Sequence, residues 1–222
     1  MTHHYPQYLK DKTLTTPRFI LASQSPSRAN LLKQAGYLFE QMDPGFDDPA
    51  TPELAGYLNP CALAQDLAMQ KAISAVKICR AKELMTPYIL LASDTITLCP
   101  DGTLLGKPLD ADHARRMITS LVDASHTVIT GCCIIDVDQP RRRTIFADQA
   151  DLYFGKITAQ QIQQFISSGQ WQGKSGGYNL SERQAQGWPI RVVQGDDPTT
   201  VIGLPMQKLK KELAPYRIHG SA

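Results

Sequence analysis

The chain has 222 residues, which is enough for one large domain or two small lobes around a substantial core. Its 42% hydrophobic and 20% charged residues are typical of a soluble globular protein. With 23 basic against 21 acidic residues, the net charge of +2 gives no general case for binding nucleic acid or a membrane, and no apolar run approaches the ~20 residues of a membrane span. Any anion-binding site must therefore be local.

The predicted helices are residues 25–35, 59–84, 110–123, 158–169 and 203–216. The predicted strands are residues 18–23, 37–42, 88–99, 103–106, 126–138, 142–155 and 189–195. Because the last two long strands form a hairpin around the sequence QPR, the pattern favours an α/β fold with a mixed rather than a purely parallel sheet. We expect a flexible leader over 1–17, one domain over 18–214 and a tail over 215–222.

The leader lacks the apolar core of a secretory signal. The five cysteines show no C-x-x-C spacing, and most lie in apolar runs, so we expect buried, reduced thiols in a cytoplasmic protein and no zinc site.

The first predicted helix has an unusual beginning. Ser25 can be its N-cap and Pro26 its first residue, but its first turn carries Arg28 and no acid. A cation there opposes the helix dipole, which favours negative charge at this end. An anion that binds both Arg28 and the helix terminus would explain the arrangement.

Asp94 interrupts an otherwise apolar strand. An ionised carboxylate in such a place must be paired, metal-bound or open to a cleft, although a strand-end Asp that caps a turn or faces solvent is an equal alternative. Lys107 follows after a tight turn that can bring it back towards Asp94. By itself, Lys107 is more typical of a surface lysine.

Other candidate residues are weaker when each is taken alone. Lys71 lies in the middle of the long helix, where a solvent-facing lysine is the better interpretation. Asp47 and Asp48 suit a hard cation such as Mg²⁺, but they also suit a solvated turn. Lys174 lies in the glycine-rich loop 173–183, whose backbone could approach an anion. His126, without a second ligand at metal spacing, is interpreted as a structural histidine with a polar partner.

Taken together, these segments resemble one family. The motifs are, in order, LASQSPSRANLLKQAG, FDD, MQKA, ASDT, LLGKP, HTVITG, GKSGGY and VIGLP. They are similar in type and order to those of the Maf (septum formation inhibitor-like) nucleoside triphosphate pyrophosphatases, over about residues 18 to 210.

The resemblance implies a fold and a reaction. The fold is a mixed, elongated sheet with flanking helices and two lobes around a nucleotide cleft, related to the inosine triphosphate pyrophosphatases. The reaction converts a nucleoside triphosphate and water to the monophosphate and pyrophosphate, with Mg²⁺ or Mn²⁺ as the divalent metal. Family members often form dimers, so a homodimer is a candidate assembly, with neither nucleic acid nor membrane as a partner.

The resemblance also implies roles for single residues. Asp94 corresponds to the catalytic aspartate, which accepts a proton from water, and is a candidate metal ligand with Asp47 and Asp48. Substrate-binding positions are Ser23, Ser25, Arg28, Lys71, Thr95, Lys107, Lys174 and Ser181.

Three positions depart from, or mix, the family patterns. Ser27 replaces the first of two arginines, and Ser181 stands where a glutamine accompanies dTTP and UTP preference. Ser181 with Glu182 is closer to the branch that hydrolyses 7-methyl-GTP, whereas Thr95 is not. The base therefore stays open, with a lean towards a purine or modified base. The alternative function is a nucleotide-binding regulator of cell division that does not turn over.

Overall fold

The structure, a computed structural model, describes residues 18–47, 59–82, 88–216 and 218–219. Within these residues the chain forms a seven-stranded mixed sheet in the order β2-β1-β3-β5-β6-β7, with β4 paired to β3. The strands are β1 (Arg18–Ala22), β2 (Glu40–Met42), β3 (Tyr88–Leu98), β4 (Leu104–Leu105), β5 (Ala124–Asp136), β6 (Arg143–Phe154) and β7 (Ile190–Gln194). The α-helices are α1 (Pro26–Gln34), α2 (Pro60–Ala81), α3 (Ala111–Leu121), α4 (Ala159–Ser167), α5 (Leu180–Ala185) and α6 (Met206–Leu213). The predicted mixed α/β class is confirmed.

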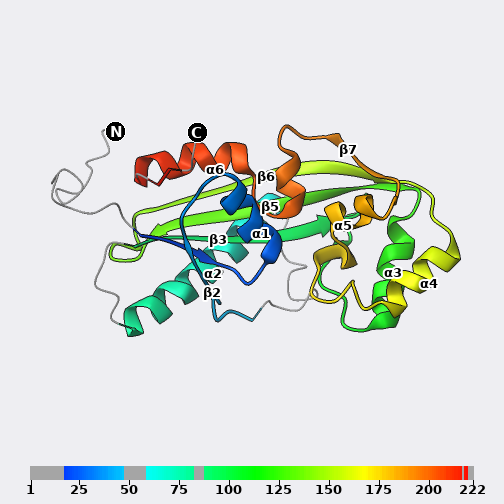
Figure 1. Ribbon diagram of the computed structural model, residues 1–222, viewed down its shortest axis with the longest axis horizontal. Coiled ribbons are helices and arrows are strands. Elements are labelled where there is room, and N and C mark those ends of the chain that lie inside the picture. The colour runs from blue at the N-terminus through cyan, green and yellow to red at the C-terminus, as the bar shows by residue number, and fades with distance from the viewer. Residues whose placement is uncertain (1–17, 48–58, 83–87, 217, 220–222) are drawn as a thin grey trace.

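Three long strands give the molecule its length. β3, β5 and β6 are antiparallel neighbours and extend through both halves of the molecule, whereas β1 pairs in parallel with β2 and with β3 (Figure 1). The predicted hairpin is confirmed, with β5 and β6 paired from Ala124 opposite Phe154 to Ile135 opposite Arg143. One continuous sheet therefore connects the two halves of the molecule.

The two faces of the sheet are covered by different helices. Because side chains alternate along a strand, Leu90 and Ala92 of β3 pack in the cluster that contains the alanines of α2. Ile89 and Leu91 point the other way and pack with residues of α1 and α6. In Figure 1, α2 and α6 accordingly lie on opposite sides of the same strands. By the same alternation, Asp94 lies on the face covered by α2, and Thr95 lies on the face covered by α1 and α6.

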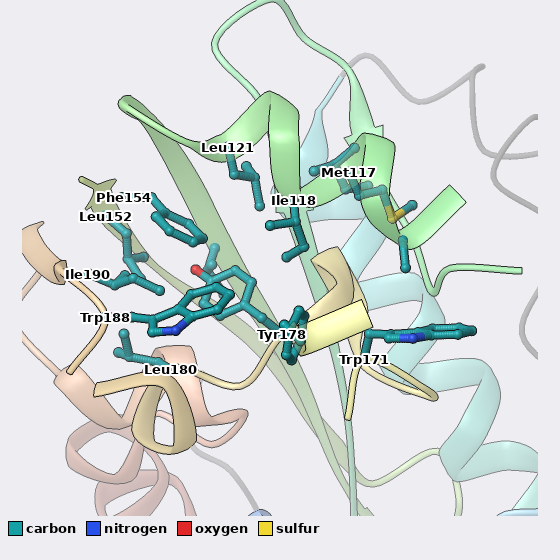
Figure 2. Packing of buried hydrophobic residues seen from close by; sticks show 14 of the residues in the cluster. Met117, Ile118, Leu121, Leu152, Phe154, Trp171, Tyr178, Leu180, Trp188 and Ile190 are labelled. Carbon is teal, nitrogen blue, oxygen red and sulfur yellow. The ribbon is translucent and has the colours of Figure 1, made fainter. Parts of the chain in front are cut away.

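A separate aromatic core occupies the other half of the molecule. In Figure 2, Ile118 and Leu121 of α3 point towards Phe154 and Trp188. The Phe154 ring lies 5.5 Å from the Trp188 ring and 5.7 Å from the Tyr178 ring, measured between centroids. This core supports the glycine-rich segment before α5, because Tyr178 belongs to it.

One edge of β3 is left open between its partners. On that side β1 pairs with β3 as far as Leu91, and β4 pairs with it only from Thr97. Within the part of the chain that the structure describes, no strand pairs with Ala92–Ile96 on this edge. The gap lies directly beside Asp94 and Thr95.

The structure corrects several predicted bounds. β2 is shorter than the predicted strand 37–42, because Tyr37 is bound to the end of α1 through Leu32 and packs on Phe19. The predicted loop 173–183 contains the start of α5, which Asn179 caps. α2 ends at Ala81 rather than at residue 84.

The predicted leader and the predicted tail have different outcomes. The predicted leader, residues 1–17, lies outside the described residues. At the other end, Tyr216 and Ile218 pack into the core, so the packed part of the chain continues beyond residue 214. Of the helices described, none has the length and apolarity needed to cross a membrane.

Candidate active site

A cleft of about 610 Å³ opens at the gap beside β3. Its walls come from both halves of the molecule, since they include the start of α1, the middle of α2, β3 and the glycine-rich segment. Most of the predicted site residues line it, namely Ser23, Ser25, Arg28, Lys71, Asp94, Thr95, Lys107 and Lys174. Segments far apart in the sequence therefore meet where the sequence predicts them to meet.

Lys71 and Asp94 form the charged centre of the cleft. The Lys71 ammonium is ion-paired with Oδ1 of Asp94, and the two residues are only 8% and 9% exposed. A buried charge is costly without a partner, so each side chain makes the burial of the other tolerable. The interpretation of Lys71 as a solvent-facing residue is wrong, because it lies on the stripe of α2 that covers the sheet.

A close contact between α2 and β5 explains why Lys71 reaches Asp94. Gly131 of β5 lies directly opposite Asp94 of β3 in the ladder. A Cβ atom on Gly131 would lie only 2.1 Å from the carbonyl oxygen of Ala64, so the missing side chain lets the α2 backbone approach the sheet. Lys71 follows Ala64 by about two helical turns on the same face. Gly131 thereby positions the lysine.

Arg28 projects from the first turn of α1, as predicted. Ser25 caps the helix by accepting a hydrogen bond from the Arg28 backbone N–H. The Arg28 guanidinium donates to the hydroxyl of Ser23 at 3.2 Å, to that of Thr95 at 3.0 Å and to the carbonyl of Gly203 at 3.1 Å. These contacts hold a cation at a helix N-terminus, where backbone N–H groups also favour an anion.

The opposite wall carries two more lysines. Lys107 follows β4 and Lys174 precedes the glycine-rich turn, whose Gly176 N–H donates to the carbonyl of Gly106 at 2.9 Å. Gly176 has φ +66°, and a Cβ atom there would lie 2.9 Å from the Thr97 hydroxyl. Lys174 is ion-paired with Glu182, the residue after Ser181. The cleft is thus lined by cations on both sides.

Two residues of the cleft wall were not predicted as site residues, although Glu182 had been noted with Ser181 for base preference. Glu182 and Asn179 line the cleft, and Asn179 also donates to the Ser27 hydroxyl at 3.3 Å. Their signal in the sequence is an N-cap residue, Asn179, followed three positions later by Glu182. Ser181 is exposed on α5 and is not among the lining residues.

Carboxylates suitable for a hard cation occur in and near the cleft. Asp94 and Asp43 line it, and Asp47 is exposed a few residues farther on. Asp48 lies outside the described residues. No cluster of three or more acidic, histidine or cysteine ligands occurs within the described residues. Mg²⁺ typically uses one or two carboxylates together with substrate phosphates, so the oxygen-only donor set fits such an ion.

His126 is a structural residue, as predicted. It is buried, and its Nε2 lies 2.6 Å from the Tyr178 hydroxyl. Burial lowers the pKa of His126 from 6.5 to about 4, against a smaller opposite effect of the Asp151 carboxylate. Burial also raises the pKa of Tyr178. The pair is therefore neutral near pH 7 and fixes Tyr178, which forms part of the cleft wall.

This geometry defines a class of site. Arginine and lysine side chains from four segments surround one buried carboxylate in an open cleft, an arrangement that suits a polyanionic substrate and a reaction with water. The sequence of residues 18–216 matches the family model described as "Maf-like protein". The chain belongs to the Maf family.

Relatives of the chain carry names that describe their activity. A dTTP/UTP pyrophosphatase of Agathobacter rectalis is 33% identical over 88% of this chain and 96% of its own length. A dTTP/UTP pyrophosphatase of Pelotomaculum thermopropionicum is 30% identical, over 89% and 95% respectively.

Two further similarities are partial. A human protein named "probable bifunctional dTTP/UTP pyrophosphatase/methyltransferase protein" is 29% identical over 88% of this chain, which spans only 31% of that relative. Among solved structures, a nucleoside-triphosphatase (dITP/XTP pyrophosphatase) of Mycobacterium abscessus has a TM-score of 0.39 at 12% identity, covering 64% of this chain and 76% of its own. The latter likeness is too distant to add to the family assignment.

Proposed function

We propose that this protein is a metal-dependent nucleoside triphosphate pyrophosphatase, which releases pyrophosphate and leaves the nucleoside monophosphate. The observation that carries the proposal is the buried Lys71–Asp94 pair inside a cleft that Arg28, Lys107 and Lys174 also line. The names of the family relatives support the same reaction class.

The proposed chemistry uses Asp94 as the proton acceptor. A water molecule attacks the α-phosphorus, so that a new P–O bond forms while the bond to the bridging oxygen of the β-phosphate breaks. The proton of the water passes to the Asp94 carboxylate, and the electron pair leaves with pyrophosphate. Lys71 holds the Asp94 side chain in place through their ion pair, and Arg28, Lys107 and Lys174 stabilise charge on the phosphates. Asp94 with Asp43 or Asp47 would hold the metal, which supplies further charge neutralisation.

The test is pyrophosphate release with Mg²⁺ over a panel of nucleotides. The panel contains the common ribo- and deoxyribonucleoside triphosphates, inosine triphosphate and 7-methyl-GTP. The relatives' names favour dTTP and UTP, whereas Ser181 with Glu182 favours 7-methyl-GTP, so the preferred base decides between the two patterns. Reaction in ¹⁸O-labelled water should place the label in the monophosphate. Label in the pyrophosphate would contradict attack at the α-phosphorus.

The Asp94→Asn variant provides the control for mechanism. We expect a loss of turnover of about 10²–10⁴-fold, the usual contribution of a general base, with an unchanged fold by circular dichroism. Asp101→Asn, in an exposed turn, should retain activity. If the folded wild-type protein binds nucleotides but releases no pyrophosphate from any of them, the alternative role as a regulator without turnover is favoured instead.

A further inference from the structure

A line of hydroxyl groups runs from the Arg28 guanidinium into the protein interior. Thr95 of β3 accepts a hydrogen bond from Arg28, and its hydroxyl lies 3.0 Å from that of Thr130 of β5. The Thr130 hydroxyl lies 2.7 Å from the carbonyl oxygen of Thr200. Thr130 is fully buried and is not among the residues that line the cleft.

Counting donors fixes the direction of this line. A guanidinium can only donate, and a carbonyl oxygen can only accept. The Thr130 proton must therefore point to Thr200, so the Thr95 proton must point to Thr130. Thr95 is left with its oxygen turned towards Arg28. Thr95 accepts from the arginine in any case, and what Thr130 fixes is the direction of the Thr95 proton, which points away from Arg28.

Thr130 also connects two separate supports of Arg28. One support is Thr95 on β3, and the other is Gly203, whose carbonyl accepts from the Arg28 Nε–H. Gly203 ends the 3₁₀ turn Pro198–Ile202, which contains Thr200. Since Thr130 bonds to Thr95 and to Thr200, it holds the strand and the turn at a fixed separation.

The turn is itself anchored to the sheet. The Thr200 hydroxyl donates to Oδ2 of Asp148 on β6 at 2.6 Å, and Lys208 of α6 is ion-paired with Oδ1 of the same carboxylate at 2.5 Å. A Cβ atom on Gly203 would lie 2.8 Å from the Nε atom of Arg28, so the turn fits closely against the arginine. The support of Arg28 thus continues to a point well outside the cleft.

We propose that Thr130 is a positioning residue, whose hydroxyl orients the Arg28 guanidinium for the substrate's phosphates by way of Thr95 and the 198–203 turn. The inference rests on the proposed function for the identity of the ligand. The orientation of Arg28 itself does not depend on that function, so it can be measured separately.

The test compares Thr130→Val, which keeps the shape but removes the hydroxyl, with Thr130→Ser, which keeps the hydroxyl. Binding of a triphosphate analogue with a non-hydrolysable α,β-bridge is measured by calorimetry, and KM and kcat are measured for the best substrate of the panel. We expect Thr130→Val to weaken binding and raise KM by about tenfold, with a smaller change in kcat, and Thr130→Ser to restore both. Thr127→Val is the matched control, because it removes a hydroxyl bonded to Asp151 on the same strand, away from the cleft.

A double-mutant cycle separates positioning from a general loss of stability. In an Arg28→Met background, Thr130→Val should cause no further loss of binding, since the group that it positions is gone. An equal loss in both backgrounds, failure of Thr130→Ser to rescue, or an equal effect of Thr127→Val would overturn the proposal.

NMR of the Arg28 Nε–H group keeps this test distinct from the proposed function. In the ligand-free protein, Thr130→Val should speed hydrogen exchange of that group several-fold relative to wild type and Thr130→Ser. Unchanged exchange in Thr130→Val would refute the positioning role even if the enzyme assay succeeds. A protein that binds no nucleotide but shows faster exchange would refute the proposed function and leave the positioning of Arg28 supported.

Discussion

His126 predicts how stability depends on pH. The folded protein holds its pKa at about 4, whereas the unfolded chain has the ordinary value of 6.5. Between these values the unfolded state binds more protons, so acid favours unfolding, and this contribution to stability is lost as the pH falls from 6.5 towards 4. We expect a loss of about 2 kcal/mol between pH 7 and pH 5 from this residue, measured by urea unfolding at each pH.

Variants at two histidines separate this effect from the rest of the acid response. His126→Gln should have a smaller fall in the free energy of unfolding from pH 7 to pH 5, whatever its stability at pH 7. His113→Gln, on a helix with a partly exposed side chain, should behave as the wild type. An unchanged pH dependence in His126→Gln would show that the buried imidazole does not stay neutral in the folded state.

Single residues show where sequence reasoning succeeds and where it fails. Ser25 and Pro26 carry a local signal for a helix start, and the structure confirms it. Lys71 was assigned to the site through the family motif, and it lines the cleft, but the interpretation of this residue taken alone as solvent-facing was wrong because it ignored helical phase. It follows Ala64 by seven residues and Leu67 by four, which puts it on their buried stripe. Thr130 gave no signal, because its partners Thr95 and Thr200 are distant in sequence.

At the scale of elements, the approach of α2 to β5 should control the catalytic pair. In Gly131→Ala, the new Cβ atom would meet the Ala64 carbonyl at 2.1 Å, so the helix must move outward and take Lys71 from Asp94. We expect a loss of about 1–3 kcal/mol in the free energy of unfolding, typical of overpacking. We also expect kcat per folded molecule to fall at least tenfold.

Another glycine offers a matched control for this effect. A Cβ atom on Gly155 would lie 3.0 Å from Pro189, at the far end of the hairpin from the α2 contact. Gly155→Ala should also lower stability but leave kcat per folded molecule close to wild type. Normal kcat in folded Gly131→Ala would contradict the role assigned to the close contact. Circular dichroism at the assay temperature gives the folded fraction.

The elements differ in how strongly the sequence specifies them. The long helix α2 and the β5–β6 hairpin were predicted because many residues repeat one period, so a few exceptions do not hide it. α5 was missed, since a helix of six residues is too short to show a clear helical repeat of apolar residues. The strand β2 was predicted too long. Tyr37 is buried because it packs with residues of α1, so its apolar character does not belong to the alternating pattern of a strand.

For the whole molecule, we expect one ligand in the cleft to contact both halves and so to stabilise the fold. Arg28 and Lys71 belong to the half with the α1, α2 and α6 cores, whereas Lys174 belongs to the half with the aromatic core. A non-hydrolysable nucleoside triphosphate with Mg²⁺ at 100 times its Kd should stabilise the fold by about 2.7 kcal/mol, measured as a rise in Tm. At the same ligand concentration, Lys174→Met should show a smaller rise.

The control for this prediction is Lys77→Met, which removes an exposed lysine of α2 outside the cleft. Its rise in Tm should equal that of the wild type. If Lys174→Met also retains the full rise, the ligand does not use the wall formed by the second half, and the two halves are not joined through the phosphates.

At this scale the sequence specifies the class of fold better than the site. The mixture of helices with a long hairpin was enough for the α/β class. The open edge of β3 was not predictable from these patterns, because it depends on where β1 and β4 stop relative to a third strand. The motifs gave most of the cleft residues, and the predicted strand already put Asp94 and Thr95 on opposite faces, but only the structure shows which helices cover each face.

The contact between Arg28 and Gly203 has a consequence for how the protein is made. The two residues are 175 positions apart, so the ribosome must add 175 residues after Arg28 before the acceptor of the arginine exists. A nascent chain that ends before Gly203 contains Asp94, Lys71 and Lys174 but lacks the carbonyl that accepts from Arg28. If Arg28 binds the phosphates as proposed, the growing chain gains its supported arginine only once Gly203 has been synthesised.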